Sequence, residues 1–302
     1  MASRADRRAT VPELPDLEAY RRALASRIVG HPIERVTLLH PFLLRTVTPP
    51  IDAVVGRRVV GVRRIGKRVV LALEGDLFVV VHLMIAGRFQ WLARNAKPPG
   101  RITLATFDFP AGRLALTEAG TKRRASLHVG LGERDLAALD PGGVEPLDCD
   151  LATFERLLMR ENHTLKRALT DPKTFAGIGN AYSDEILHRA KLSPLAQTSK
   201  LAADEVARLY TATREVLVEW TTRLSDEAAR DWPVKVTAFR PEMAVHGRFG
   251  KPCPVCGAPV QRIVYAENEC NYCARCQIGG RILADRALSR LLKASFPRTL
   301  DD

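Results

Sequence analysis

Cys253-Pro-Val-Cys256 and Cys273-Ala-Arg-Cys276 are two Cys-x-x-Cys pairs, separated by sixteen residues, in a chain of 302 residues. Each tight turn lets two thiolates converge, and two such turns complete a tetrahedron of sulfur around Zn²⁺. Four protein ligands leave no open position for water, so we expect one structural zinc ion. The segment holds few large apolar residues, and metal binding is therefore expected to supply much of its folding energy.

The remaining cysteines bear on this interpretation. All but Cys149 fall within residues 253–276. The first eight residues lack the apolar core of a secretion signal, so we expect a cytoplasmic protein. In a reducing compartment such clustering favours metal binding over disulfides. Cys270 lies three residues before Cys273, which leaves open a different pair of ligands.

The composition is that of a globular protein with a strong positive charge. Hydrophobic residues make up 46% and charged residues 26% of the chain. Lysine and arginine number 46 against 34 acidic residues, for a net charge of +12. This excess favours a polyanionic partner, either nucleic acid or an acidic membrane surface, although a basic protein without such a partner is the alternative. No segment approaches the ~18 apolar residues of a membrane span.

The first half of the chain predicts a helix followed by a β-rich domain. After Pro15, apolar residues recur at helical spacing until Gly30, which is well placed to end the helix. From about Val59 to Leu116, short β-rich runs alternate with turn residues, which is typical of a β-sandwich or barrel. The expected strands are residues 69–73, 77–81, 87–91, 102–107 and 113–117.

The second half predicts a helical domain. Asp140-Pro-Gly-Gly143 looks like a linker, and from Leu151 to about Arg230 the apolar pattern is helical. The longest helical run extends from Ala202 to Leu224. A length of 302 residues allows two or three domains, each with its own core.

Three segments carry a resemblance to a known family. They are Pro12-Glu-Leu-Pro-Asp-Leu-Glu18, Gly177-Ile-Gly-Asn-Ala-Tyr-Ser-Asp-Glu185 and Val245-His-Gly-Arg-Phe-Gly-Lys-Pro-Cys-Pro-Val-Cys-Gly257. In this order they resemble the mature N-terminus, the helix-two-turn-helix motif and the zinc hairpin of the formamidopyrimidine-DNA glycosylase and endonuclease VIII family. The resemblance runs from residue 12 to about 280.

The resemblance implies an α+β, multidomain fold. It would comprise an N-terminal β-sandwich with a leading helix, a helical helix-two-turn-helix domain that binds DNA, and a C-terminal zinc hairpin. The expected bounds are residues 12–138, 150–235 and 245–280, preceded by a disordered extension or misassigned start at 1–11 and followed by a helical tail at 281–302.

The family excises oxidised bases and then cuts the abasic strand. The resemblance therefore implies a monomeric base-excision-repair glycosylase and abasic-site lyase that acts by β,δ-elimination on double-stranded DNA containing oxidised bases or abasic sites. A non-catalytic protein that binds damaged DNA is the alternative. A zinc-ribbon RNA-binding factor would also fit the charge and the cysteines, but it leaves Pro12, Glu13 and Asn180 unexplained.

The expected catalytic residues are Pro12, Glu13 and Lys67. A terminal proline is a secondary amine that can attack C1′ of a damaged nucleoside, and a neighbouring carboxylate can move the protons. Pro12 can equally be an ordinary residue at a helix start, and Lys67 a solvated lysine at a strand end. Eleven residues precede Pro12, so we hypothesise that Val11 marks the true start, because GUG encodes methionine when it initiates translation.

The expected DNA-binding residues are Lys166, Asn180, Arg123, Arg124 and Asn268. Lys166 and Asn180 match phosphate-contacting positions of the family, and the glycines around Asn180 would let backbone amides approach a phosphate. Taken alone, Gly-x-Gly-Asn is more often a helix-entry turn, and an arginine run is usually a solvated face. Asn268 stands where the family's hairpin usually carries an arginine.

The sequence also departs from the family at other positions. Arg262 or Arg275 would have to replace the charge missing at Asn268. The family's usual gap-filling loop is absent, and Met84, Ile85, Arg123 or Arg124 would have to hold the stack open when a base is flipped. Residues 226–245 differ from the loop that covers oxoguanine, so no preference for that base is inferred. The hairpin resemblance favours Cys273 and Cys276 over Cys270 as ligands.

Overall fold

The computed structural model describes residues 11–119, 122–234, 236, 240–265, 268–284, 291 and 298–300. Contacts divide the chain into two compact units: unit 1 is Met1–Pro141 with Trp220–Thr237, and unit 2 is Gly142–Glu219 with Ala238–Asp302. This grouping joins the zinc hairpin to the helical segment that we expected to be separate. The predicted extension lies outside the described residues except for Val11, and most of the predicted C-terminal tail does too.

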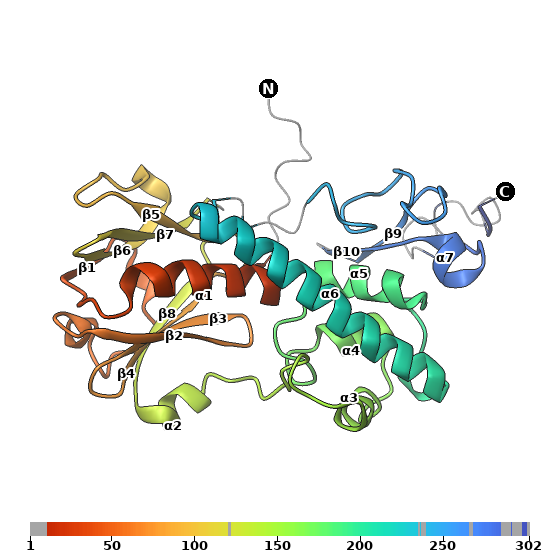
Figure 1. The fold of residues 1–302 in the computed structure, drawn as a ribbon, viewed down its shortest axis with the longest axis horizontal. Helices are drawn as coiled ribbons and strands as arrows, with labels where there is room; N and C mark the ends of the chain where they lie inside the picture. The colour runs from red at the N-terminus through yellow and green to blue at the C-terminus, as the bar shows by residue number, and fades with distance from the viewer. Residues whose placement is uncertain are drawn as a thin grey trace. The chain divides into compact units, whose positions relative to one another are not determined.

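Unit 1 is the predicted β-sandwich with a leading helix (Figure 1). One sheet has the order β1-β6-β7-β5 and the other the order β2-β3-β4-β8, and every neighbouring pair is antiparallel. The strands are β1 (Arg35–Leu38), β2 (Val59–Ile65), β3 (Arg68–Leu73), β4 (Leu77–His82), β5 (Gly87–Leu92), β6 (Thr103–Phe109), β7 (Gly112–Glu118) and β8 (Ser126–Leu131).

Two central strands, β3 and β4, are buried on both faces, which explains their continuous apolar sequences. The side chains of Val70 and Val80, which are paired in the register, pack in one cluster with Leu136 of the short helix α2 (Gly132–Ala137). Their sequence neighbours Val69 and Val81 are also buried and, by the alternation of a strand, point to the opposite face.

The five predicted strands are all present. β2 lies at the start of the predicted β-rich region but was not among the five, and β1 and β8 lie outside that region. The predicted helix is α1 (Leu14–Ile28), which packs against β2 (Figure 1). Its apolar face is fully buried, including Leu17, Tyr20 and Leu24. β1 has only four residues, none of them buried, and so it carries too little pattern to stand out in the sequence.

Unit 2 begins at the predicted linker and contains the helical segment. The helices are α3 (Leu151–Leu158), α4 (Leu165–Thr170), α5 (Asn180–Ala190) and most of α6 (Ala203–Arg230). The long run predicted from Ala202 to Leu224 is therefore correct at its start, and the helix continues to Arg230. Contacts assign the last part of α6, from Trp220, to unit 1.

The C-terminal part of unit 2 is a two-stranded hairpin, β9 (Gln261–Tyr265) and β10 (Asn268–Tyr272), followed by α7 (Ala274–Ile278). β10 contacts α5, so the hairpin rests on the helix that carries the predicted helix-two-turn-helix motif. Among the described residues, no helix has the length and apolar character needed to cross a membrane.

Candidate functional site

Pro12 and Glu13 lie directly before α1, and both are buried in unit 1. Glu13 is the N-cap residue of the helix, and its backbone N–H donates to the Asp16 carboxylate at 3.0 Å. Pro15 occupies the first turn, where a missing N–H costs nothing. The Pro-Glu-Leu-Pro-Asp sequence therefore builds the helix start itself, and this start holds Pro12 one residue before the cap.

Lys67 lies in the two-residue turn between β2 and β3, beside Gly66, which has a φ of 54°. Near the end of β2, the Arg64 guanidinium pairs with Glu18 of α1 at 3.1 Å. This ion pair joins the strand that leads into the Lys67 turn to the helix that follows Glu13.

Basic groups gather around this turn, and their charges act on one another. Burial first, then Arg68, Lys67 and His128, lower the pKa of His82 to about 4. Burial, Arg68 and Arg45 likewise lower the pKa of His128. We call Arg45, Lys67, Arg68, His82 and His128 the basic edge. Its fixed positive charge suits a phosphate group.

The turn between β4 and β5 adjoins the basic edge. His82 Nδ1 accepts the N–H of Met84 at 2.9 Å, and Met84 adopts a positive φ of 53°. The Arg88 guanidinium donates to the Ile85 carbonyl at 3.1 Å. These bonds fix the turn while the Ile85 side chain is 37% exposed. Ile85 is one of the four candidate gap-filling residues. It places an exposed apolar side chain on a turn whose backbone is held by hydrogen bonds.

Arg123 and Arg124 are exposed, as expected for either a DNA groove or a solvated face. The Arg123 guanidinium donates to the Arg101 carbonyl at 2.5 Å. The Arg124 N–H donates to both carboxylate oxygens of the buried Glu118 at 3.0 Å, so the backbone here is anchored while the side chain is exposed.

Trp232 anchors the chain after α6 within unit 1. Its indole N–H donates to the Phe89 carbonyl at 3.1 Å, and its ring lies 5.8 Å from Tyr20 and 6.2 Å from Trp91. The start of the segment that replaces the family's base-covering loop is therefore packed on β5 and α1.

In unit 2, Asp184 of α5 is the centre of a buried polar network. Its carboxylate faces the Lys166 ammonium at 2.5 Å and His246 Nδ1 at 2.8 Å, and it accepts the Asn271 N–H at 3.0 Å. Burial by itself would raise the pKa of Asp184, but Lys166 and His246 hold it below its ordinary value. Lys166 was predicted to contact phosphate. In the structure its ammonium pairs with Asp184, and its side chain is 13% exposed.

Glu185, the next residue on α5, holds the chain that leads into the hairpin. Its carboxylate accepts three consecutive backbone N–H groups, those of Ala244 at 2.7 Å, Val245 at 2.9 Å and His246 at 2.9 Å. Burial raises the pKa of Glu185, although these three bonds oppose the shift. Together Asp184 and Glu185 attach both the hairpin and its lead-in to one helix.

Asn180 is the first residue of α5, and its side-chain amide donates to the Glu269 carbonyl on β10 at 2.8 Å. Asn268 opens β10 opposite Tyr265, and its side chain lies outside the described part of the chain. Of the two possible replacements for its charge, Arg262 stacks on Phe249 and pairs with Glu269 at 3.6 Å. Arg275 is exposed on α7.

The four predicted cysteines converge beside α7. The sulfur atoms of Cys253 and Cys276 lie 3.9 Å apart, and those of Cys256 and Cys273 lie 3.4 Å apart. Tetrahedral zinc with bonds of about 2.3 Å places its sulfurs roughly 3.8 Å apart. This donor set fits one zinc ion.

Cys270 is placed differently from these four residues. It lies in β10, paired with Ile263, and is 1% exposed. Burial, followed by the charge of Asp184, raises its pKa well above the ordinary value. The ligand atoms that lie within 4.8 Å of one another are those of His188, Cys253, Cys273 and Cys276, and Cys270 is outside this group.

The sequence analysis missed the carboxylates of Asp184 and Glu185, and it also missed His188, whose Nε2 lies 3.3 Å from Cys253 Sγ. The two carboxylates could have been identified from the sequence, because both stand in the quoted helix-two-turn-helix segment. Two adjacent acids on a helix with a buried face indicate buried polar contacts. His188 follows Asp184 by one helical turn.

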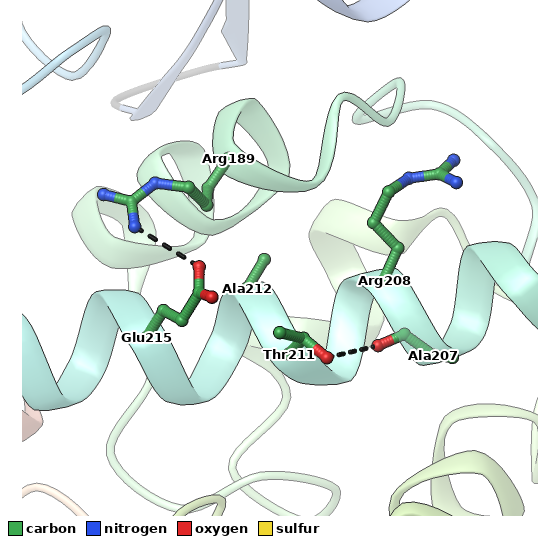
Figure 2. Close-up of a pocket in the computed structure, with 6 residues that line it drawn as sticks. All are labelled: Arg189, Ala207, Arg208, Thr211, Ala212 and Glu215. Atoms are coloured by element: carbon green, nitrogen blue, oxygen red, sulfur yellow. Dashed lines mark hydrogen bonds and ion pairs between the residues drawn. The ribbon is translucent and has the colours of Figure 1, made fainter.

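A shallow surface pocket also lies between α5 and α6 (Figure 2). The Arg189 side chain reaches towards Glu215 and pairs with it at 3.4 Å, and it also pairs with Glu219 at 2.8 Å. Arg208 donates to the Ala190 carbonyl at 2.8 Å. Because the protein's own groups already satisfy these cations, we assign no ligand to this pocket. Its lining residues are Arg189, Ala207, Arg208, Thr211, Ala212 and Glu215.

Comparison with known proteins gives the same order of parts. The formamidopyrimidine-DNA glycosylase N-terminal domain matches residues 11–125, its H2TH domain matches residues 142–224, and the zinc finger found in FPG and IleRS matches residues 250–278. The formamidopyrimidine-DNA glycosylase of Thermus thermophilus is 35% identical over 281 residues, which cover 88% of this chain and 98% of that protein.

Two further relatives match. An uncharacterized formamidopyrimidine-DNA glycosylase-like protein of Mycobacterium tuberculosis is 42% identical over 151 residues, which cover 50% of this chain and 94% of that protein. The Lactococcus lactis glycosylase, solved non-covalently bound to DNA with an abasic site, superposes with a TM-score of 0.77 at 26% identity. It covers 88% of this chain and 99% of that chain. The fold, the zinc cluster and these matches agree: the chain belongs to the formamidopyrimidine-DNA glycosylase family.

Proposed function

We propose that the protein is a base-excision-repair DNA glycosylase that also cleaves abasic sites, acting as a monomer on double-stranded DNA with oxidised bases or abasic sites. The observation that carries the proposal is the start of the N-terminal family match at residue 11. Pro12 and Glu13 therefore stand at the matched start, and the structure holds them at the cap of α1.

The proposed chemistry begins with a base rotated out of the duplex, since its glycosidic carbon is inaccessible in the stack. The Pro12 nitrogen attacks C1′, the base leaves with a proton, and an iminium ion forms on the sugar. The iminium acidifies the C2′ protons, and loss of one of them expels the 3′-phosphate. The resulting conjugated iminium acidifies the C4′ proton, whose loss expels the 5′-phosphate, and water then hydrolyses the iminium and releases Pro12. Glu13 would exchange protons with the sugar oxygen, and Lys67 would neutralise a phosphate beside it.

This chemistry needs a free amine on Pro12. In the chain as given, Val11 acylates that nitrogen, and an amide nitrogen has no nucleophilic lone pair. We therefore propose that the active form starts at Pro12, through initiation at Val11 and removal of the initiating methionine. The mass of protein made from the native gene tests this step, and a chain retaining residues 1–11 would contradict it.

Borohydride trapping on abasic-site DNA tests the activity. A chain starting at Pro12 should form a covalent adduct that maps to Pro12, whereas the full chain should form none at that residue. Glu13→Gln in the shorter chain should slow strand cleavage by about 100-fold or more. Glu34→Gln is the matched control, because Glu34 pairs with Arg94 and belongs neither to the cap of α1 nor to the Lys67 turn. An active full chain, or an adduct on another residue, would contradict the mechanism.

A non-catalytic protein that binds damaged DNA is the alternative function. The acylated Pro12 nitrogen and the uncharged Asn268 favour it. In that case the chain starting at Pro12 would bind abasic-site DNA tightly but give no adduct and no cleavage. If the adduct does form, a panel of duplexes with single defined oxidised bases would then identify the lesion that is excised.

A further inference from the structure

His188 stands beside the zinc cluster without belonging to the zinc-finger segment. It lies on α5 and is 6% exposed, and its Nε2 is 3.3 Å from Cys253 Sγ, across 65 residues of sequence. The ligand atoms of His188, Cys253, Cys273 and Cys276 all lie within 4.8 Å of one another. Five donor side chains thus surround a site where zinc takes four.

The sulfur geometry decides which four side chains bind. Cys256 Sγ lies 3.4 Å from Cys273 Sγ, and Cys253 Sγ lies 3.9 Å from Cys276 Sγ, so two sulfurs from each Cys-x-x-Cys turn meet two from the other. The zinc-finger match at residues 250–278 includes all four cysteines and excludes His188. With the tetrahedron filled by thiolates, the histidine is left outside it.

Two of the other three thiolates accept hydrogen bonds from nearby backbone. Cys273 Sγ accepts the N–H of Cys276 at 3.5 Å, and Cys256 accepts that of Ala258. Four thiolates around Zn²⁺ leave a net charge of −2, which N–H donors stabilise. Cys253 alone among these three receives its donor from a side chain on another element.

We propose that His188 is a positioning residue of the zinc centre. Its Nε2–H donates to the Cys253 thiolate, which lowers the basicity of that sulfur and ties the zinc cluster to α5. The same helix holds the hairpin through Asp184 and Glu185, so His188 adds a third attachment at the cluster itself. This role does not depend on the proposed catalytic activity.

Zinc transfer from the full-length, zinc-loaded protein to a chromophoric chelator at neutral pH tests the proposal. His188→Phe keeps a ring of similar size without a donor, and it should retain one zinc per chain but release it about 10-fold faster or more. His188→Gln offers an amide donor, so its rate of zinc release should lie between the rates of the parent and of His188→Phe. His163→Phe is the control, because His163 lies in the same unit and pairs with Glu161 at 2.9 Å. It should release zinc at the parental rate.

Cobalt substitution separates a hydrogen-bond donor from a ligand. The thiolate-to-cobalt absorption of the His188→Phe protein should match that of the parent, because all four sulfurs remain bound, and Cys256→Ser should change it. An unchanged zinc-release rate in His188→Phe would overturn the proposal. An altered cobalt spectrum in His188→Phe with an unaltered one in Cys256→Ser would also overturn it, since His188 would then be a ligand. If His188→Phe fails to fold, the test rests on His188→Gln. Zinc release from His188→Gln that is as fast as zinc release from denatured protein would contradict the proposal.

Discussion

The β-sandwich of unit 1 and the zinc hairpin of unit 2 are stabilised by different means. The sandwich buries long apolar strands on both faces of β3 and β4. The hairpin has a small buried cluster made of Val245, Ala258 and Val260 with cysteines. It depends on thiolates that face one another and on two buried carboxylates of α5. A segment too small for its own core therefore uses metal and charge, where the larger domain uses apolar area.

The two units also differ in how their basic residues are placed. In unit 1, Lys67 and Arg68 of the basic edge are half-buried, and burial together with their charges lowers the pKa of the neighbouring His82. In unit 2, Lys166 is buried against Asp184, so its charge is largely matched within the protein. Basic residues at the surface are expected to govern DNA binding, and buried ones stability.

Zinc removal should produce the largest difference between the units. A structural zinc site contributes about 10 kcal/mol or more to the folding of its segment. After chelation under reducing conditions, amide exchange should lose protection in residues 250–278 and in β9 and β10, while β3 and β4 keep theirs. Loss of protection in both regions would show that the sandwich depends on the metal too.

A cavity in the sandwich should destabilise unit 1 and leave the zinc hairpin of unit 2 unaffected. Phe107 on β6 is 1% exposed, and Phe107→Ala should cost about 3–5 kcal/mol through lost burial and the cavity left behind. Chemical denaturation, followed together with zinc release, should show the unit 1 transition at lower denaturant and unchanged zinc release. Earlier zinc release in this variant would mean that the two units unfold as one.

Removing the charge of Asp184 should weaken unit 2. Asp184→Asn leaves the Lys166 ammonium buried without its counter-charge, which costs about 3 kcal/mol. Asp204→Asn is the matched control, because its carboxylate is 75% exposed and pairs with Arg208. That control should cost less than about 1 kcal/mol. Equal losses in the two variants, measured by denaturation, would refute a special role for the buried network.

Acid should destabilise unit 1 through His82. Its pKa falls from 6.5 to about 4 on folding, so between these values the unfolded chain binds the extra proton. Stability is therefore complete above pH 6.5 and declines as the pH falls towards 4, by about 1–3 kcal/mol. His82→Gln should flatten this decline, whereas His31→Gln, an exposed histidine of the same unit, should not. An unchanged pH profile in His82→Gln would remove His82 as the cause.

The smallest effect concerns DNA binding. Lys67→Ala should reduce the slope of log affinity against log salt by about one unit, as expected for one lost phosphate contact. Lys166→Ala should instead lower the stability of unit 2, because the buried Asp184 loses the ammonium with which it pairs and keeps only His246 and the Asn271 N–H among its described partners. Binding titrations at several salt concentrations compare the two variants. A full unit of slope lost in Lys166→Ala, with stability retained, would restore that lysine to a phosphate contact.

Much of the fold was predictable from local patterns. The helix after Pro15 and five strands followed from apolar periodicity, and the spacing of the cysteines predicted the zinc turns. β1 and β8 were missed because short strands with mixed faces carry little periodic signal. The expectation of a separate hairpin domain also did not anticipate its packing on α5, since nothing in residues 245–280 states which helix they contact.

The candidate site was predictable residue by residue but not as an arrangement. Pro12, Glu13, Lys67 and Asn180 remain predicted site residues, and the structure places them at a helix cap, a hairpin turn and a helix start. It assigned nothing to Asp184, Glu185 or His188. Apart from Lys166, which lies 18 residues from Asp184, the partners described for these side chains lie 59 to 87 residues away, and no local pattern encodes contacts over such distances.

By itself the sequence determined most of the secondary structure, the zinc ligand spacing and the family of this protein, because periodicity and spacing are properties of short segments. Only the tertiary structure decided which charged and polar groups meet inside the fold. It packed Lys166 against Asp184 and brought His188 to the sulfur of Cys253. Burial and pairing depend on segments that meet only when the chain has folded.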